Sequence, residues 1–145
     1  MLEAALGALY LAIVTTRAVL AASVARRQPA TAPYRGEGVD VAQAILSGDP
    51  RLADVLGDDV EALPEARFLW LVDEHDTEAH RVCAALKAAH PTVRIDVLVV
   101  PPAPDRTNPK LWKLEAAYRA STAPTFLVLD DDTRLSGATL GALVH

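Results

Sequence analysis

The chain reads FLWLVDEHD at residues 68–76. The continuous apolar run Phe68–Val72 is typical of a strand that is buried on both faces, as the strands of a parallel sheet are. Asp76 stands directly before residues 77–79, in the position where an aspartate commonly caps the first turn of a helix. The stretch therefore predicts a buried strand that ends in acidic residues and is followed at once by a helix.

The alternation of strand and helix continues on both sides of this stretch. Further strands are predicted at Val39–Leu46, Val93–Val100 and Thr125–Leu129. Helices are predicted between them by apolar residues at helical spacing over residues 52–63, and by Pro109–Ala120, which has proline at its first position. No hairpin signal separates the strands, so the predicted fold class is α/β with a mostly parallel sheet, which binds ligands at the carboxyl ends of its strands.

The composition agrees with one folded domain. The 145 residues are 51% hydrophobic and 23% charged, which excludes a wholly disordered chain. A net charge of −5 excludes a basic nucleic-acid-binding protein, and the one cysteine excludes a disulfide framework or a multi-cysteine zinc site. The net charge is unevenly distributed along the chain, at +3 over residues 1–35 and −8 over the remaining residues.

The basic amino-terminal part, residues 1–27, is predicted to be a membrane anchor. From Ala4 to Ala25 the 22 residues are mostly apolar or small, and as a helix they reach about 33 Å, enough to cross a bilayer core. Arg17 costs roughly 2.5–3.5 kcal/mol near mid-span, which the eight Leu, Ile and Val residues nearly offset. The alternatives are a buried helix and a signal peptide, although Glu3 stands where a signal peptide carries basic residues.

The arginines after the apolar span predict the orientation of the chain in the membrane. Arg26, Arg27 and Arg35 follow the span, which favours a cytoplasmic globular part and a location at the cell membrane. Residues 28–38 contain two prolines and two glycines and are predicted to be a linker. The globular domain is then predicted over residues 39–145.

Acidic residues follow two of the predicted strands. Asp130 and Asp132 can face the same side of an extended backbone, with Asp131 facing the other. Paired carboxylates are hard oxygen ligands that suit Mg²⁺ or Mn²⁺ together with substrate phosphates. The alternatives are a solvated acidic turn for this triplet, a strand terminus for Asp73 and a helix cap for Asp76.

An anion site is predicted at the start of the helix Pro109–Ala120. Its free backbone N–H groups, with Lys110 and Arg106, can bind an anion beside the acidic residues. The alternative for Lys110 and Lys113 is a solvated helix face. Cys83 lies on an apolar helix face and is predicted to be an inert core thiol.

Four ordered motifs resemble the amino-terminal half of the ceramide glucosyltransferases, which belong to the family 2-type nucleotide-sugar glycosyltransferases. The motifs are Ile45-Leu46-Ser47-Gly48-Asp49-Pro50, Val72-Asp73-Glu74-His75-Asp76, Asn108-Pro109-Lys110 and Asp130-Asp131-Asp132-Thr133-Arg134. The resemblance covers the chain from about Val39 to its end. An amino-terminal anchor with a cytoplasmic catalytic domain is also similar to that group.

The resemblance implies a GT-A fold that binds a UDP-sugar and transfers its hexose to a lipid hydroxyl, with inversion. Asp73 or Glu74 would contact the nucleoside, with Asp76 close by. Asn108 and Lys110 would lie near the nucleotide. Asp130 and Asp132 would be the family's D-x-D pair, which binds the metal ion and the ribose.

The chain also departs from that family. Glu74 replaces an aspartate, and Trp112-Lys113 replace an asparagine pair, so the acceptor need not be ceramide. The family's general base and its later Arg-Trp motif lie beyond the D-x-D strand, so the resemblance predicts that a carboxyl-terminal half is needed for transfer and that this chain alone is inactive. Two other functions stay open: a non-catalytic nucleotide-sugar-binding remnant, and a receiver-like or phosphatase-like domain that binds Mg²⁺.

Overall fold

A computed structural model describes residues 10, 12–21, 23 and 34–144. The chain divides into two compact units, Met1–Thr31 and Ala32–His145, and each is described by itself. Most of the predicted linker, residues 28–33, lies outside the described residues, as does much of the predicted anchor.

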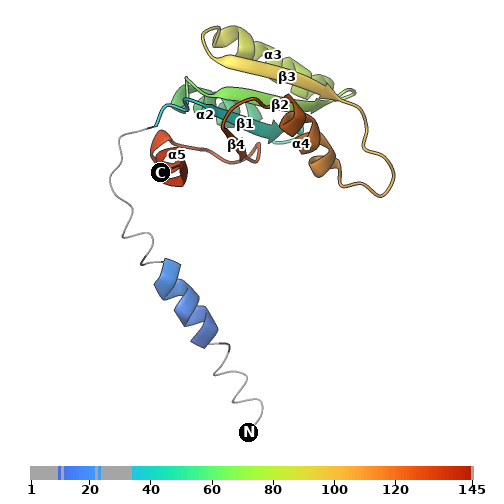
Figure 1. The fold of residues 1–145 in the computed structure, drawn as a ribbon. Helices are drawn as coiled ribbons and strands as arrows, with labels where there is room; N and C mark the ends of the chain where they lie inside the picture. Colours follow the sequence, from blue (N-terminus) through green and yellow to red (C-terminus); the bar gives the residue numbers. More distant parts are fainter. Residues whose placement is uncertain (1–9, 11, 22, 24–33, 145) are drawn as a thin grey trace. The chain divides into compact units, whose positions relative to one another are not determined.

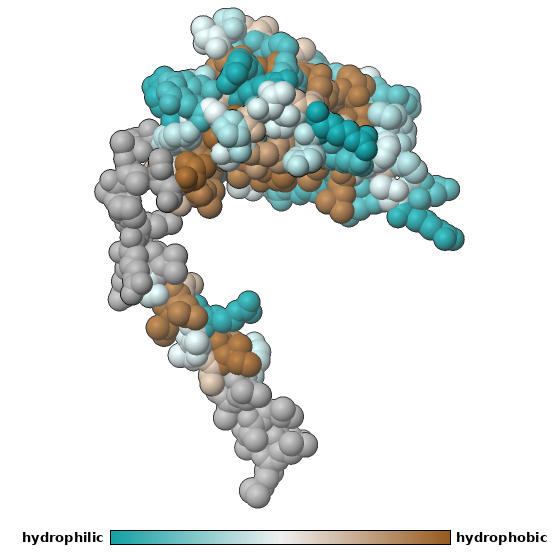
Figure 2. Space-filling model, in the orientation of Figure 1, coloured by the Kyte–Doolittle hydropathy of each residue, from teal (hydrophilic) through white to brown (hydrophobic). Residues whose placement is uncertain are grey.

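The described residues of the first unit are helical and carry exposed apolar side chains (Figure 2). Tyr10 is 69% exposed, Val19 63% and Leu20 58%. Within the described residues, no helix is both long enough and apolar enough to cross a membrane.

The second unit is an α/β domain with four parallel strands (Figure 1). Its elements in chain order are β1 (Val39–Ala44), α2 (Leu52–Ala62), β2 (Arg67–Asp73), α3 (Thr77–Ala89), β3 (Arg94–Val100), α4 (Pro109–Ala120), β4 (Thr125–Val128) and α5 (Gly137–Val144). The strand order is β3-β2-β1-β4, so the chain adds two strands on one side of β1 and then returns to add β4 on the other. Crevices form at the carboxyl ends of the strands where such an order reverses.

Each face of the sheet has its own hydrophobic cluster. The side chains of Phe68, Trp70 and Val72 pack with α2, α3 and Leu140 of α5, and all of these side chains are buried. Leu69 and Leu71 point to the opposite face and pack with Ala117 of α4. The apolar run Phe68–Val72 is therefore buried on both sides, which confirms the sequence prediction for this strand.

The predicted parallel α/β class and the predicted strands and helices are confirmed, with ends that differ by a few residues. Asp76 caps α3, because its carboxylate accepts a hydrogen bond from the backbone N–H of Ala79 at 3.0 Å. Asn108 caps α4 and accepts from the N–H groups of Lys110 and Leu111. The helix α5 was not predicted, because its sequence GATLGALV is short and contains two glycines.

The last residues of the predicted linker pack against the domain. Tyr34 donates its backbone N–H to Gly137 O at 3.1 Å, and Glu65 N donates to Arg35 O at 3.0 Å. Gly36 adopts a φ of +95° beside Ala66, where a Cβ atom would lie 2.6 Å from the Ala66 side chain. Residues 34–38 are thus held by the fold rather than extended away from it.

Candidate functional site

A cavity of about 360 Å³ lies at the carboxyl ends of β1 and β2, beside the first turn of α4. Its lining residues are Ala44, Leu46, Asp73, Asn108, Pro109, Lys110, Lys113 and Asp131. The parallel sheet and the cap of α4 bring together residues of all four sequence motifs, which lie far apart in the chain. The cavity therefore combines two lysines, two carboxylates and the N-terminus of a helix.

Lys113 is the most buried charged group of this cavity. Its side chain is 7% exposed, whereas that of Lys110 is 49% exposed. The Lys113 ammonium lies 2.7 Å from Asp73 Oδ2 and donates a hydrogen bond to Ile45 O at 3.1 Å. A solvated position for Lys113, the alternative considered from sequence, is therefore wrong, because α4 directs this side chain between the ends of β1 and β2.

Lys110 and the acidic triplet meet beside the cavity, which is lined by Asp131 but not by Asp130 or Asp132. The Lys110 ammonium pairs with Asp130 Oδ1, and both side chains are about half exposed. Asp131 accepts a hydrogen bond from the backbone N–H of Leu46 at 2.8 Å through its Oδ2. Asp132 is exposed and accepts from the Thr133 hydroxyl. The middle aspartate, which sequence reasoning left without a role, thus joins the triplet to the end of β1.

Asp76 is held by backbone groups on both of its carboxylate oxygens. Oδ1 accepts from Ala79 N and Oδ2 accepts from Ser47 N at 2.9 Å. Burial raises the pKa of Asp76, but the hydrogen bonds from Ser47 and Ala79 and the nearby Lys113 charge outweigh it and leave this pKa below its usual value. Asp76 therefore joins α3 to the loop after β1.

The other residues of the DEHD motif lie in different environments. Asp73 lines the cavity, and its backbone carbonyl lies 3.1 Å from His80 Nε2. Glu74 is exposed and pairs with His75, whose side chain is 82% exposed. The structure thus brings Asp73 to the cavity, while Glu74 and Asp76 do not line it.

The acidic triplet offers carboxylates of the kind that bind divalent ions. Asp130 and Asp132 supply exposed carboxylates, the hard oxygen ligands that Mg²⁺ and Mn²⁺ prefer. Among the described residues no three acidic, histidine or cysteine side chains gather closely enough to hold a metal ion by themselves. A bound ion would accordingly take its remaining ligands from substrate phosphates and water, as Mg²⁺ commonly does in nucleotide sites.

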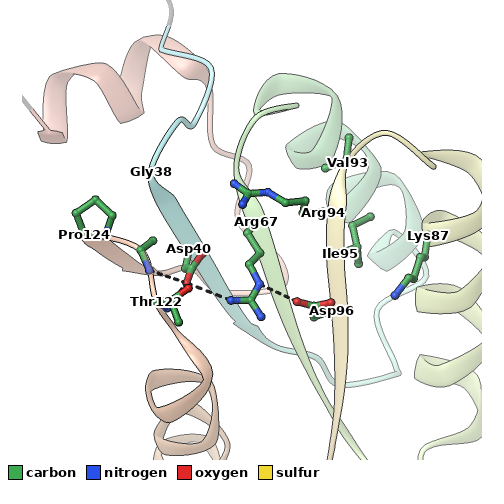
Figure 3. A pocket seen from close by; sticks show the side chains of 11 residues that line it. Gly38, Asp40, Arg67, Lys87, Val93, Arg94, Ile95, Asp96, Thr122 and Pro124 are labelled. Atoms are coloured by element: carbon green, nitrogen blue, oxygen red, sulfur yellow. Dashed lines mark hydrogen bonds and ion pairs between the residues drawn. The ribbon is translucent and has the colours of Figure 1, made fainter.

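A second, larger cavity of about 690 Å³ lies at the opposite, amino-terminal edge of the sheet (Figure 3). Most of its charged groups are paired with one another. Arg67 donates to Asp96 at 2.7 Å and to Ala120 O, and Asp40 accepts from Ser121, Thr122 and Ala123. These bonds join α4 to the sheet, so we regard this cavity as part of the scaffold.

Comparisons with known proteins identify the fold and the family. A family model described as "Glycosyl transferase family 21" matches residues 1–145. No curated protein matches the chain significantly. A mannosyltransferase from Pyrobaculum calidifontis, solved in complex with GDP-Man and Mn²⁺, is similar, with a TM-score of 0.60 and 17% sequence identity. The match covers 98% of this chain and 42% of that protein, so the chain spans about two fifths of its length. The likeness supports the GT-A fold that the resemblance to ceramide glucosyltransferases implied.

Proposed function

Because the chain belongs to glycosyl transferase family 21, we propose that the cavity at the carboxyl ends of β1 and β2 binds a nucleoside diphosphate sugar as the donor of a transfer reaction. The observation that carries this proposal is that Lys110, the N-terminus of α4 and Asp131 of the acidic triplet line one cavity, and that Lys110 also pairs with Asp130. A diphosphate is an anion, and both a lysine and a helix N-terminus favour anions. Membership of a glycosyltransferase family, together with a lysine and a helix N-terminus that suit a phosphate, therefore favours a donor-binding domain over a receiver-like domain.

Three polar residues that line the cavity have a proposed part in donor binding. Asp73 accepts hydrogen bonds from the nucleoside, and Lys110 exchanges its partner Asp130 for the diphosphate. Asn108 fixes the start of α4. The backbone N–H groups expected to be free there are not free, because Pro109 has none and those of Lys110 and Leu111 bond to the Asn108 side chain, so the positive end of the helix dipole is what favours the anion. Glu74 and Asp76, also proposed from sequence as donor contacts, are assigned supporting positions beside the cavity.

Asp130 and Asp132 are the proposed ligands of Mg²⁺ or Mn²⁺. When bound, the ion would offset the negative charge that develops on the leaving diphosphate. The mannosyltransferase was solved in complex with GDP-Man and Mn²⁺, which supports this assignment. An acidic domain that binds an anionic nucleotide also benefits from a bound cation.

The proposed reaction transfers a hexose from a UDP-sugar to a lipid hydroxyl with inversion. The acceptor oxygen bonds to the anomeric carbon as the bond from that carbon to the diphosphate oxygen breaks, and a general base takes the acceptor proton. The described residues do not identify this base, so the part assigned to this chain is donor binding. The UDP-sugar and the lipid acceptor are proposed from the ordered motifs that resemble ceramide glucosyltransferases.

A membrane location is proposed for the same protein. The exposed apolar side chains of the first unit, and the arginines at positions 26, 27 and 35 after the apolar stretch, support an amino-terminal anchor with a cytoplasmic domain. Such an anchor would keep the domain close to a lipid acceptor.

Titration calorimetry of the full chain tests donor binding. UDP-glucose and GDP-mannose are titrated with Mn²⁺ and again with a chelator, and we expect one of them to bind at least about tenfold more tightly with Mn²⁺, about 1.4 kcal/mol. Asp132→Ala should abolish this dependence, whereas Asp54→Ala, at an exposed position of α2, should not. Binding that neither the chelator nor Asp132→Ala changes would overturn the metal assignment, and no binding of either donor would overturn the proposed function.

A further inference from the structure

The peptide group between Ile45 and Leu46 connects Lys113 to the acidic triplet. Its carbonyl oxygen accepts from the Lys113 ammonium at 3.1 Å, and its N–H donates to Asp131 Oδ2 at 2.8 Å. A peptide group is planar and nearly rigid, so its oxygen and its N–H cannot be reoriented separately. Hydrogen bonds in such a chain also polarise one another, so the ammonium strengthens the bond that Asp131 accepts.

The same ammonium also pairs with the Asp73 carboxylate. It lies 2.7 Å from Asp73 Oδ2 at the end of β2. No partner for the other oxygen, Oδ1, is found in the part of the chain that the structure describes, and Asp73 lines the cavity. This oxygen is available to accept a hydrogen bond from a ligand, in the orientation that Lys113 imposes on the carboxylate.

We propose that Lys113 is a positioning residue for the donor site: its buried ammonium orients Asp73 directly and Asp131 through the peptide group between Ile45 and Leu46. The role in donor binding rests on the proposed function above. Lys113 acts through these groups because its side chain is 7% exposed and already has two oxygen partners. Lys110, one turn earlier on α4 and 49% exposed, is the lysine placed to contact the donor itself.

The proposal explains why a charged side chain is buried at this place. A buried ammonium is costly unless it is paired and hydrogen-bonded, and here it has one carboxylate and one carbonyl as partners. Methionine is similar in length and would fill the space but could hold neither oxygen. Arginine keeps the charge and the donors, although its geometry differs.

The first test measures backbone amide hydrogen exchange in the full chain. In Lys113→Met, we expect the Leu46 amide to exchange about tenfold faster than in the wild type, because the Asp131 bond loses its support. The neighbouring Ser47 amide is bonded to Asp76 instead and should change by less than about twofold. Lys87→Met, at an exposed position of α3, is the control and should leave both rates unchanged. Unchanged exchange at Leu46 in a folded Lys113→Met would overturn the proposal.

The second test measures the dissociation constant for UDP-glucose with Mn²⁺. We expect Lys113→Met to raise it by about tenfold or more, and Lys113→Arg to recover part of the loss, whereas a purely structural role would move the unfolding temperature but not the affinity of the folded protein. Lys113→Gln replaces Lys113→Met if the latter does not fold. Wild-type affinity in these variants would overturn the role of Lys113 in binding. A wild-type chain that binds no donor would overturn the proposed function, and the exchange rates would then decide the positioning role by themselves.

Discussion

Asp59 is a carboxylate with no exposed surface, and it closes a polar network inside the core. Its Oδ2 accepts from Gln43 Nε2 at 3.0 Å and its Oδ1 accepts from Leu135 N at 2.7 Å. Gln43 in turn accepts from the Trp70 indole at 2.9 Å. Burial raises the pKa of Asp59 to about 6 against the hydrogen bonds that favour its charged form. The network therefore fixes Leu135, which follows the acidic triplet in the segment after β4.

Asp59 should make the stability of the protein depend on pH. The unfolded carboxyl titrates near 3.8 and the folded one near 6, so the folded state binds more protons between these values. The contribution of Asp59 is therefore greatest below pH 3.8 and falls by up to about 3 kcal/mol as the pH rises through 6. Urea unfolding at several pH values measures this contribution as the unfolding free energy of the wild type minus that of Asp59→Asn. This value should fall as the pH rises through 6, and a value that rises with pH would contradict the prediction.

Two glycines with positive φ should respond differently to alanine. Both Gly36→Ala and Gly48→Ala impose backbone strain, since φ is +95° and +141°. Only at Gly36 would the new Cβ also meet the backbone and side chain of Ala66, at 2.6 Å to 3.0 Å, because nothing lies within 4 Å at Gly48. We expect Gly36→Ala to cost about 1–3 kcal/mol more than Gly48→Ala in chemical unfolding. Equal losses would mean that residues 34–38 do not pack against the domain as described.

At the scale of single elements, α3 depends on its cap. Asp76→Ala removes the acceptor for Ala79 N and also leaves Ser47 N without its partner. We expect a loss of about 1–2 kcal/mol in the free energy of unfolding, and a smaller loss for Asp76→Asn, which can still cap the helix. Asp54→Ala, in the first turn of α2, is the comparison and should change stability by less than about 0.5 kcal/mol. A loss at Asp76 no larger than at Asp54 would refute the capping role.

The elements of the sheet were predictable because their signals are local. The run Phe68–Val72 identifies a strand buried on both faces, and Asp76 and Asn108 with Pro109 identify where helices begin. These signals also place Asp73 and the acidic triplet at one edge of the sheet. Their specific partners depend on how distant elements pack, which no local pattern encodes.

The burial of Lys113 was not predictable from its type, because lysines are rarely buried. Its spacing offers a signal in retrospect: Lys113 lies four residues before the buried Ala117, on the face of α4 that packs against the sheet. The buried Asp40 and Asp59 escaped notice for the same reason. In each case the polar atoms find partners from other elements, and among the described residues no buried side-chain polar atom lacks a hydrogen bond.

At the scale of the whole molecule, the first unit carries the proposed membrane location. Arg17 costs roughly 2.5–3.5 kcal/mol near the middle of a span, so Arg17→Leu should increase the fraction of the protein that resists alkaline extraction from membranes. Arg94→Leu, on β3 of the second unit, is the control and should leave that fraction unchanged. A wild type and an Arg17→Leu variant that are both extracted completely would contradict the anchor.

The donor is proposed to bind at the carboxyl edge of the sheet. Backbone chemical shifts of the isotope-labelled full chain, recorded during titration with UDP-glucose or GDP-mannose and a diamagnetic Mg²⁺ salt, locate the bound donor directly. We expect the largest shift changes at Leu46, Lys110 and Asp131, which line the smaller cavity, and little change at Gly38 and Thr122, which line the larger one. Changes centred on Gly38 and Thr122, or none with either donor, would contradict this binding site.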